Sequence, residues 1–520
     1  MLLILAIFSK LTSNADYINI FFNSDTLYLP SLYKDLIQEH NGLKGWHLSG
    51  APNFFPDTIF YFIIMFFTNN FIVSSLLFPV FQYIALLFLI KRLFQLIIPN
   101  YSYLFASLAN LLMMLFFFVT LCSNDFGFTF YLLSNSYHTG AFIMAFLCLI
   151  ISLNYLKSAK ILNLIILLFI CTFCVLSDRL FIILFSIPIF SIIIFLKDIL
   201  YRKKIITLLI TNISGLILGL FIFKSIRSGS YITIPPPHRM MDFNNIIPSY
   251  KILKEQMGAY ITNLNFETII IIGSIISLLV IIFIFFSNLK KEKTLSIFTL
   301  YCFISIVYIL IVFFTPVLSG SYTGWDIQRY NIYAFYISII NIGVITAYYF
   351  NKFHNNKLFL KTILSIIIVS LAFSSYIGYK QFSMSGLNKY FSFYPERVKC
   401  IDEISKKEKL SCGVAEYWTA KYTTMFSKNN VKVYAVHDDL IPYHHVTNSN
   451  WFYNKNAIFN FIILNNFSDR EAFKRKIGNN YIKIDSECVD VIKVPEFKYC
   501  PNPLDLYFTD SLKRKIINKP

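Results

Sequence analysis

The sequence predicts a polytopic α-helical membrane protein of about eleven transmembrane helices, followed by an extracytoplasmic α/β domain. Three observations predict this fold class. Hydrophobic residues make up 56% of the 520 residues, and only 14% are charged. Apolar runs of about 20 residues, long enough to cross a hydrocarbon core of roughly 30 Å, recur through residues 1–376. From residue 377 to 520 the long apolar runs stop and charged residues become frequent.

The transmembrane helices follow from the bilayer-length criterion. We expect them at residues 71–90, 101–121, 139–156, 161–177, 180–196, 205–223, 267–288, 294–314, 332–350 and 358–377. An apolar N-terminal run, interrupted by Lys10, Asn14 and Asp16, predicts a short or partly polar first helix rather than a cleaved signal peptide. The run "FFPDTIFYFIIMFF" is too short to span and predicts an interfacial helix.

Basic residues gather in alternate loops, and this pattern predicts the orientation. These loops contain Lys91 with Arg92, Lys157 with Lys160, residues 197–204, residues 290–293, and Lys352 with Lys357. By the positive-inside rule all of them face the cytoplasm. The opposite face then holds a long first outer loop, residues 17–70, and the C-terminal domain. Because the net charge of +18 is explained by these loops, we reject a nucleic-acid-binding function.

Acidic residues follow the opposite distribution. Of the 13 that precede residue 378, only Asp198 and Glu292 fall in the expected cytoplasmic loops. Carboxylate chemistry is therefore expected on the outer face. The first outer loop alone carries four of these side chains, Asp25, Asp35, Glu39 and Asp57.

The C-terminal segment alternates strand-like and helix-like runs, which predicts a small α/β domain. The expected strands lie in "CGVAEYW", 431–436, 459–464 and 489–494, with a helix in "TAKYTTMFSKNN". Four cysteines, Cys400, Cys412, Cys488 and Cys500, allow two disulfides with three connectivities in an oxidising compartment. We favour Cys400–Cys412 and Cys488–Cys500, which close short loops; four unpaired buried thiols are the alternative.

Two further groups of residues have the composition of metal sites but also have an ordinary structural explanation. Cys171 and Cys174 form a CxxC inside an apolar run, where helix packing explains them better than a metal. The cluster His437, Asp438, Asp439, His444 and His445 is either a metal site or a polar loop after a strand.

An enzyme acting on the outer face needs a donor that arrives in the lipid, because nucleotides are not normally available there. The sequence also lacks a glycine motif that cradles phosphate. Transfer from a lipid-linked sugar needs a carboxylate to deprotonate the acceptor hydroxyl, and cations or a metal ion to hold the leaving phosphate.

The segments "NSDTLYLPSLYKDL" and "FFPD" in the first outer loop, with "CSNDFGF" in the second, resemble the GT-C superfamily. These polyprenyl-phosphate-dependent glycosyltransferases include protein mannosyltransferases and the aminoarabinose and lipopolysaccharide-core sugar transferases. The resemblance covers the architecture of residues 1–376, and the C-terminal domain matches no sub-family.

The resemblance implies a polyprenyl-phosphate-linked sugar donor, and an envelope glycan, lipid or protein as acceptor, in a bacterial inner membrane. It implies Asp25 as the catalytic base and Asp125 as an assisting or metal-binding acid, with Asp57 as a rival for either role. A divalent metal ion held by Asp25 and Asp125 is left open. Asp25 as a helix N-cap is the structural alternative.

Phosphate contacts are expected from cationic residues on the outer face. Arg329, three residues after Asp326, is the strongest candidate. The others are Arg179, His138, His238 and Arg239. In "LSDRLF", an ion pair between Asp178 and Arg179 is the alternative to phosphate binding by Arg179. Asp35 and Glu39, four residues apart beside Lys34, predict the solvated face of an interfacial helix.

Two rival functions stay open. One is a transporter or flippase of a lipid-linked or small solute, which would show internal repeats and interrupted helices with polar groups at mid-membrane. The other is a non-catalytic envelope assembly protein that binds a partner through its C-terminal domain.

Overall fold

A computed structural model describes residues 1–12, 15–123, 127–135, 137–197, 199–235, 241–262, 266–292, 295–324, 327–352, 357–454, 457–499 and 506–508. Contacts divide the chain into two compact units. The membrane unit comprises Met1–Ser13, Asn53–Ser225 and Pro237–Asn388. The sheet unit comprises Asn14–Pro52, Ile226–Pro236 and Lys389–Pro520. The first outer loop and the C-terminal segment thus contribute to one unit.

The membrane unit is built of helices. They are α1 (Leu2–Leu11), η2 (Phe54–Thr58), α4 (Ile59–Thr68), α5 (Phe71–Ile97), α6 (Ser102–Ser123), α7 (Gly127–Leu133), α8 (Thr139–Ser158), α9 (Ile161–Ser177), η3 (Ile182–Ser186), α10 (Ile187–Phe190), η4 (Ser191–Phe195), α11 (Ile199–Ser228), η5 (Phe243–Asn245), α12 (Ile246–Thr262), α13 (Phe266–Lys291), α14 (Ile297–Leu318), α15 (Gln328–Lys352), α16 (Lys357–Gln381) and α17 (Met384–Phe391). Helix α11 ends inside the sheet unit, and α17 crosses the boundary between the units.

Within the described residues, eight helices are long and apolar enough to cross a membrane: α5, α6, α8, α11, α13, α14, α15 and α16. The protein is therefore a polytopic helical membrane protein, as predicted. Helices also occupy the predicted positions 161–177 and 180–196, but these are shorter than the length of a full span. The total of about eleven spans stays a prediction.

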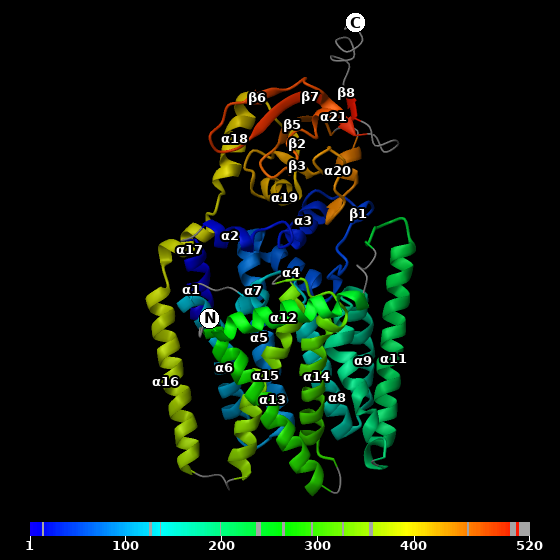
Figure 1. Cartoon of the computed structure of the whole chain (residues 1–520), viewed down its shortest axis with the longest axis vertical. Coiled ribbons are helices and arrows are strands. Elements are labelled where there is room, and N and C mark those ends of the chain that lie inside the picture. The colour runs from blue at the N-terminus through cyan, green and yellow to red at the C-terminus, as the bar shows by residue number, and fades with distance from the viewer. Residues whose placement is uncertain are drawn as a thin grey trace. The chain divides into compact units, whose positions relative to one another are not determined.

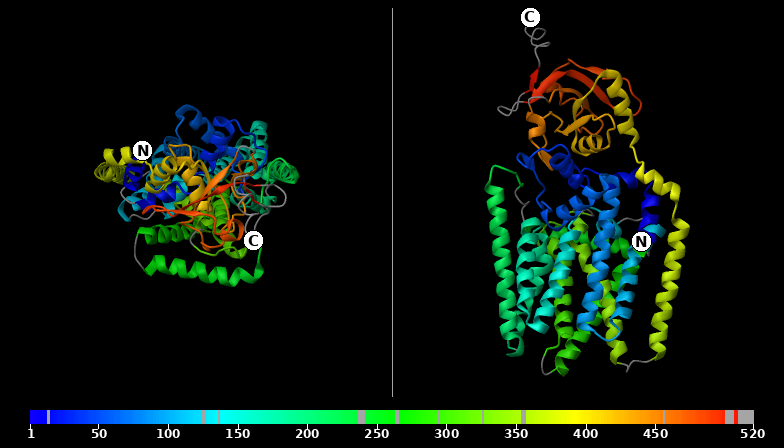
Figure 2. Two further views of the ribbon diagram at one scale, coloured as in Figure 1. Left: turned by 90° about the horizontal axis from the view of Figure 1, so that it is seen from above. Right: turned by 180° about the vertical axis from the view of Figure 1, so that it is seen from behind.

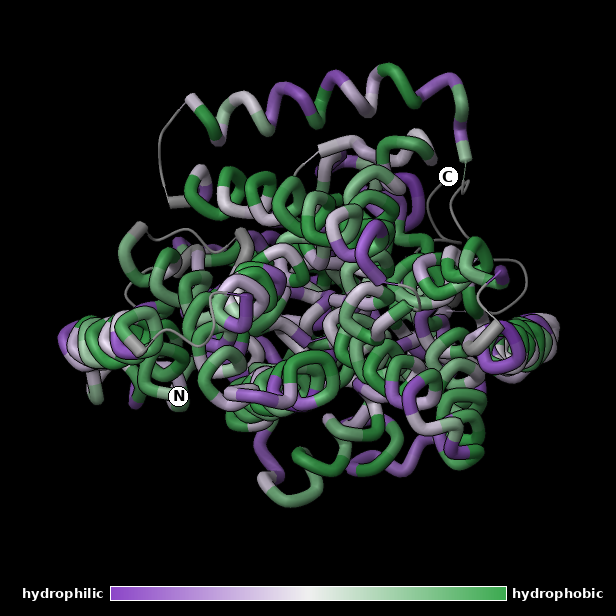
Figure 3. The backbone as a smooth tube through the Cα atoms, turned by 90° about the horizontal axis from the view of Figure 1, so that it is seen from below, coloured by the Kyte–Doolittle hydropathy of each residue, from purple (hydrophilic) through white to green (hydrophobic). Residues whose placement is uncertain are grey.

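The long helices run alongside one another (Figures 1 and 2), and when they are seen end-on from below hydrophobic residues predominate in them (Figure 3). In α8 and α15, 72% of the most apolar stretch is buried, whereas in α16 only 11% is buried. Apolar surface of this extent is unfavourable in water. Helices α8 and α15 therefore form the core of the unit, while α16 presents its side chains to lipid.

The interrupted first run forms α1, a ten-residue helix whose side chains are mostly buried. Lys10, which breaks the apolar run, donates a hydrogen bond from Nζ to the carbonyl of Leu121 at 2.6 Å. Close to α1, Gly386 lies so near the carbonyl of Ser9 that a Cβ would approach it to 2.4 Å. Lys10 is therefore accommodated within the packed helices.

The sheet unit contains α2 (Ala15–Phe21), α3 (Tyr28–Tyr33), η1 (Lys34–Gln38), β1 (Trp46–His47), α18 (Glu396–Glu408), β2 (Cys412–Ala415), α19 (Tyr417–Phe426), β3 (Lys432–Ala435), β4 (Thr447–Asn448), α20 (Asn450–Tyr453), β5 (Phe459–Ile463), α21 (Lys474–Ile477), β6 (Ile482–Ile484), β7 (Val491–Tyr499) and β8 (Leu506–Phe508). The larger sheet has the order β3-β2-β5-β7-β6, and β8 pairs with β7 (Figure 1). β1 from the first outer loop pairs with β4 in a second, two-stranded sheet.

Strand β2 lies between β3 and β5 and is parallel to both, while β7 is antiparallel to β5. Apolar clusters cover both faces, one around Val414, Phe459 and Phe497, the other around Ala415, Val433 and Phe461. This explains why the central strands read as apolar runs. The four predicted strands and the helix after the first are confirmed, and the chain forms β1, β4, β6 and β8 in addition.

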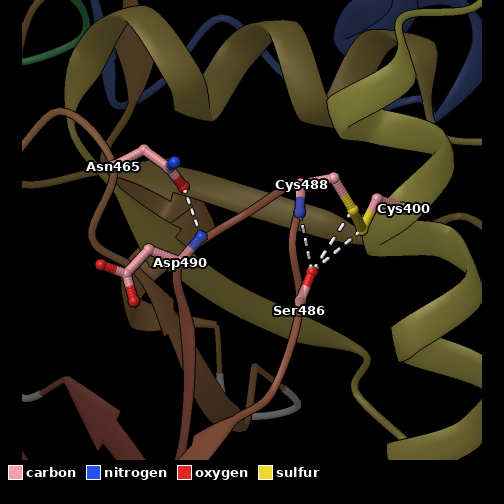
Figure 4. Close-up of a disulfide and its surroundings, with 5 residues drawn as sticks. All are labelled: Cys400, Asn465, Ser486, Cys488 and Asp490. Carbon is pink, nitrogen blue, oxygen red and sulfur yellow. Dashed lines mark hydrogen bonds between the residues drawn. A yellow bond between two sulfur atoms is a disulfide. The ribbon is translucent and has the colours of Figure 1, made fainter.

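The predicted disulfide pairing is wrong. Cys400 on α18 is bonded to Cys488, 88 residues later in the chain (Figure 4). Ser486 Oγ lies 3.2 Å from the sulfur of Cys400 and 3.3 Å from that of Cys488. Cys412 is a free thiol at the start of β2, and Cys500 lies outside the described residues. The short-loop argument failed because tertiary folding brings Cys488 to α18.

Candidate functional site

Asp25 lies in a turn of the first outer loop and is half-buried in the sheet unit. One carboxylate oxygen, Oδ1, accepts a hydrogen bond of 2.6 Å from the hydroxyl of Tyr417. Tyr417 is the first residue of α19, directly after β2 and the N-cap residue Glu416. The predicted base is therefore held at the carboxyl end of the central parallel strand by a residue 392 positions away.

The N-cap alternative for Asp25 is wrong. The side chain that caps the turn is Asn23, whose Oδ1 accepts hydrogen bonds from the backbone N–H groups of Asp25 at 3.0 Å and Thr26 at 2.9 Å. The carboxylate of Asp25 is thus free of a capping role. It points instead toward α19 and lines a cavity.

The cavity has a volume of about 760 Å³ and opens at the carboxyl ends of the parallel strands β2, β3 and β5. This edge is where sheets with parallel strands ordinarily bind ligands. Acidic residues, aromatic rings, imidazoles and one arginine dominate the lining. They are Asp25, Glu416, Asp438, Asp439 and Asp469; Tyr417, Trp418 and Tyr443; His437 and His445; and Arg475.

A buried amine lies near Asp25. Lys421, one turn after Tyr417 on α19, is 7% exposed and donates a hydrogen bond from Nζ to the carbonyl of Ser24 at 3.0 Å. Burial lowers the pKa of Lys421 to about 7, and the nearby Asp25 carboxylate opposes that shift. Burial raises the pKa of Glu416 at the cavity edge.

Asp35 does not lie on a solvated face, contrary to the prediction. It is 2% exposed and accepts four hydrogen bonds. Oδ1 accepts from Asn41 Nδ2 at 2.8 Å and Trp451 Nε1 at 2.7 Å, and Oδ2 accepts from Trp46 Nε1 at 2.6 Å and Asn448 Nδ2 at 3.0 Å. Glu39, in contrast, is partly exposed and forms an ion pair with Lys432 at 3.0 Å.

In the membrane unit, Asp57 is 3% exposed and accepts a hydrogen bond from Gln82 Nε2 at 3.1 Å. Gly140, in the first turn of α8, lies so close that a Cβ would come within 2.4 Å of both carboxylate oxygens. Only glycine leaves room for a carboxylate against this helix end, where the backbone dipole favours negative charge. Asp57 is therefore a buried acid packed against the first turn of α8.

The structure brings His138 and Asp178 together. His138 Nδ1 lies 2.6 Å from Asp178 Oδ2, so Asp178 has His138 as a partner in addition to its sequence neighbour Arg179. The guanidinium of Arg179 lies 4.7 Å from the ring centre of Phe223. The turn at Asp178 also contacts the segment before Asp57, through a 3.2 Å hydrogen bond from Asn53 N to the Ser177 carbonyl.

Arg329 contacts the ring of Tyr330, which in turn lies near His138. Its guanidinium lies 5.0 Å from the ring centre of Tyr330, whose ring lies 5.1 Å from that of His138. Among the described residues, the buried Nε atom of Arg329 has no hydrogen-bond partner. A buried guanidinium N–H without a partner is costly, and it is available to an anionic ligand.

Several predicted site residues lie outside the described residues: Asp125, Asp326, His238 and Arg239. Within the described chain, no group of three His, Cys, Asp or Glu side chains is arranged to hold a metal ion. Asp25, which is bonded to a tyrosine, is a single carboxylate and does not make a metal site by itself. We therefore derive no chemical step through a metal.

Sequence reasoning missed Tyr417 and Lys421. Tyr417 stands in the run "CGVAEYW", which predicts a strand, and Lys421 stands in "TAKYTTMFSKNN", which predicts a helix. Since ligands bind at the carboxyl ends of parallel strands, the residues that follow "CGVAE" were the available signal. Their pairing with Asp25 and Ser24 had no signal in the sequence, because the partners are about 390 residues apart.

Comparison with known proteins adds no relative, because neither a protein-family model nor a curated protein sequence matches the chain.

Proposed function

We propose that the protein is a membrane glycosyltransferase of GT-C type that transfers a sugar from a polyprenyl-phosphate donor to an acceptor of the cell envelope. Asp25 removes the proton of the acceptor hydroxyl. The new bond forms between the acceptor oxygen and the anomeric carbon, while the bond from that carbon to the phosphate oxygen breaks. The electron pair leaves with the polyprenyl phosphate, and the anomeric configuration inverts.

One observation carries the proposal: Asp25 lines a cavity of about 760 Å³ at the carboxyl edge of the parallel strands. This volume is typical of small-molecule sites. Carboxylates and imidazoles are suitable hydrogen-bond partners for sugar hydroxyls, and Tyr417, Trp418 and Tyr443 add aromatic surface. A half-buried carboxylate among such groups supports a role as general base.

The second part of the proposal concerns the membrane unit by itself. We assign Arg329 and His138 to the phosphate of the lipid-linked donor. The unpartnered Nε atom of Arg329 and its contact with Tyr330 beside His138 support this assignment. A planar guanidinium is well suited to phosphate oxygens.

We place this chemistry on the extracytoplasmic face. The basic loops of the membrane unit support that orientation. The Cys400–Cys488 disulfide supports it independently, since disulfides persist mainly in oxidising compartments. A bacterial inner membrane fits both arguments.

One observation favours a second candidate, a transporter. Ionisable residues buried in a membrane protein often mark ion or proton pathways, and Asp57 with the His138–Asp178 pair forms such a group. A transporter would move an intact solute, so the covalent composition of the envelope separates the two functions.

The test compares cells with and without the gene by mass spectrometry of envelope glycans and lipid-linked sugars. We expect loss of the gene to remove one sugar from an acceptor. The amount of that sugar linked to polyprenyl phosphate should increase. In gene-deleted cells, Asp25→Asn should restore transfer about 10²–10⁴-fold less effectively than the wild type, because it lacks the base. Glu403→Gln, at an exposed acid of α18, is the matched control.

A wild-type rate for Asp25→Asn protein that reaches the membrane at normal levels would remove Asp25 from the mechanism. If gene loss leaves the covalent products of the envelope unchanged but alters the distribution of a solute or lipid across the membrane, the transporter is favoured.

A further inference from the structure

The turn that carries Asp25 is attached to α19 by three hydrogen bonds. Ser24 Oγ donates to the Tyr417 carbonyl at 2.7 Å, the Tyr417 hydroxyl donates to Asp25 Oδ1 at 2.6 Å, and Lys421 Nζ donates to the Ser24 carbonyl at 3.0 Å. Ser24, Tyr417 and Lys421 are all at least 93% buried. Exchange with water does not compete with these bonds, so the position of the turn is set by α19.

Two carboxylates of this unit, the buried Asp35 and the half-buried Asp25, differ in a way that indicates function. Asp35 has both oxygens occupied by four donors, the pattern of a structural carboxylate. Within the described chain, Tyr417 is the one side chain bonded to the carboxylate of Asp25, and it bonds to Oδ1. Asp25 Oδ2 is left available on a residue that lines the cavity. A general base needs such an unoccupied lone pair.

From this geometry we propose that Tyr417 is a positioning residue for the base. It holds the Asp25 carboxylate through Oδ1 so that Oδ2 meets the acceptor hydroxyl. The inference rests on the proposed function. It also gives the C-terminal segment a direct part in the reaction, because Tyr417 belongs to the strand–helix unit of residues 412–426 rather than to the outer loop.

Tyr422 supplies a matched control on the same helix. Its hydroxyl donates to Asn19 Oδ1 at 2.8 Å, so it also attaches α19 to the first outer loop, without contacting Asp25. Tyr417→Phe and Tyr422→Phe each remove one hydroxyl and one such bond. Only the first removes the hydrogen bond to the base.

The experiment measures transfer in membranes that carry each variant, with the total lipid and acceptor extract of gene-deleted cells as substrate mixture. Dilution of the extract gives the maximal rate and the half-saturating amount. For Tyr417→Phe we expect a maximal rate at least about tenfold lower, with the half-saturating amount nearly unchanged, because misplacement of a catalytic group slows the chemical step. Tyr422→Phe should retain the wild-type rate.

A double variant separates positioning from general stability. If Tyr417 acts through Asp25, Tyr417→Phe adds little further loss in an Asp25→Asn background. A wild-type rate for Tyr417→Phe, or an equal loss for Tyr422→Phe, would overturn the inference while leaving Asp25 as the base. Full activity of Asp25→Asn would instead refute the proposed base itself. If Tyr417→Phe fails to reach the membrane, Ser24→Ala replaces it, and a wild-type rate for that variant overturns the inference.

Discussion

At the scale of single residues, Asp35 and Asp25 show how the same residue type acquires different surroundings. Asp35 precedes Glu39 by four positions and follows Lys34, a pattern typical of an exposed helix face. The structure buries Asp35 because Asn448 and Trp451, more than 400 positions later, bring donors to it. The resemblance to a known family made Asp25 a candidate base, but the sequence could not place the distant partners of either acid.

The four hydrogen bonds of Asp35 lead to a stability prediction. In Asp35→Asn, an NH2 group replaces one acceptor oxygen. This new donor then faces buried N–H donors that have lost their acceptor. We expect the free energy of unfolding of the sheet unit to fall by about 2 kcal/mol or more, since hydrogen bonds to a charged group contribute about 1.5–3 kcal/mol each. Thermal unfolding can be followed by tryptophan fluorescence, because Trp46 and Trp451 bond to this carboxylate directly.

Glu39→Gln is the control for that measurement. It removes a partly exposed ion pair with Lys432, so its effect should stay below about 1 kcal/mol. Equal stability of Asp35→Asn and wild type would show that the bonds to Asp35 are dispensable.

At the scale of elements, most of the helices and the four main strands were predictable, because their signals are local. Apolar runs of bilayer length give helices, and short runs rich in β-branched residues give strands. The pairing of elements was not predictable in the same way. The two-residue strands β1 and β4 pair across about 400 positions, and Cys400 joins Cys488 rather than its neighbour Cys412. Such choices depend on tertiary packing, which local spacing does not record.

Helix α19 carries a buried lysine, and its titration makes a prediction about pH. The pKa of Lys421 falls from 10.5 to about 7 on folding. Between these two pH values the unfolded chain binds the proton and the folded chain does not, so the contribution of this group to stability rises as pH increases from about 7 toward 10.5. Below about pH 7 Lys421 is protonated in both the folded and the unfolded state. The folded protein then carries the full free-energy cost of burying the charge.

Lys421→Met removes this titration. We expect the difference in unfolding free energy between Lys421→Met and wild type to shift in favour of wild type from pH 7 to pH 10. Chemical denaturation of both proteins at several pH values measures this difference. A constant difference across that range would contradict a lowered pKa for Lys421.

At the scale of the whole molecule, the chain is not divided at a single point. The sheet unit takes its residues from three separate stretches, one of them Asn14–Pro52. Composition changes once, near residue 377, and therefore indicates one boundary. The contribution of Asn14–Pro52 to the sheet unit has no compositional signal, because loop residues and domain residues have similar polarity. Of the candidate site, the sequence indicated Asp25 but not the helix that carries its hydrogen-bond partner.

The orientation of the whole molecule can be tested by labelling. The five basic loops predict that Lys203 faces the cytoplasm, whereas the sheet unit faces the opposite side. Lys203 and Glu403 are both exposed, on α11 and α18 respectively. In intact cells, a membrane-impermeant thiol reagent should label Glu403→Cys and leave Lys203→Cys unlabelled until the membrane is permeabilised. Because the Cys400–Cys488 disulfide requires an oxidising compartment, both cysteines should resist alkylation before reduction in the same cells. Labelling of Glu403→Cys only after permeabilisation, together with free thiols at Cys400 and Cys488, would reverse the orientation and exclude a lipid-linked sugar transfer on the outer face.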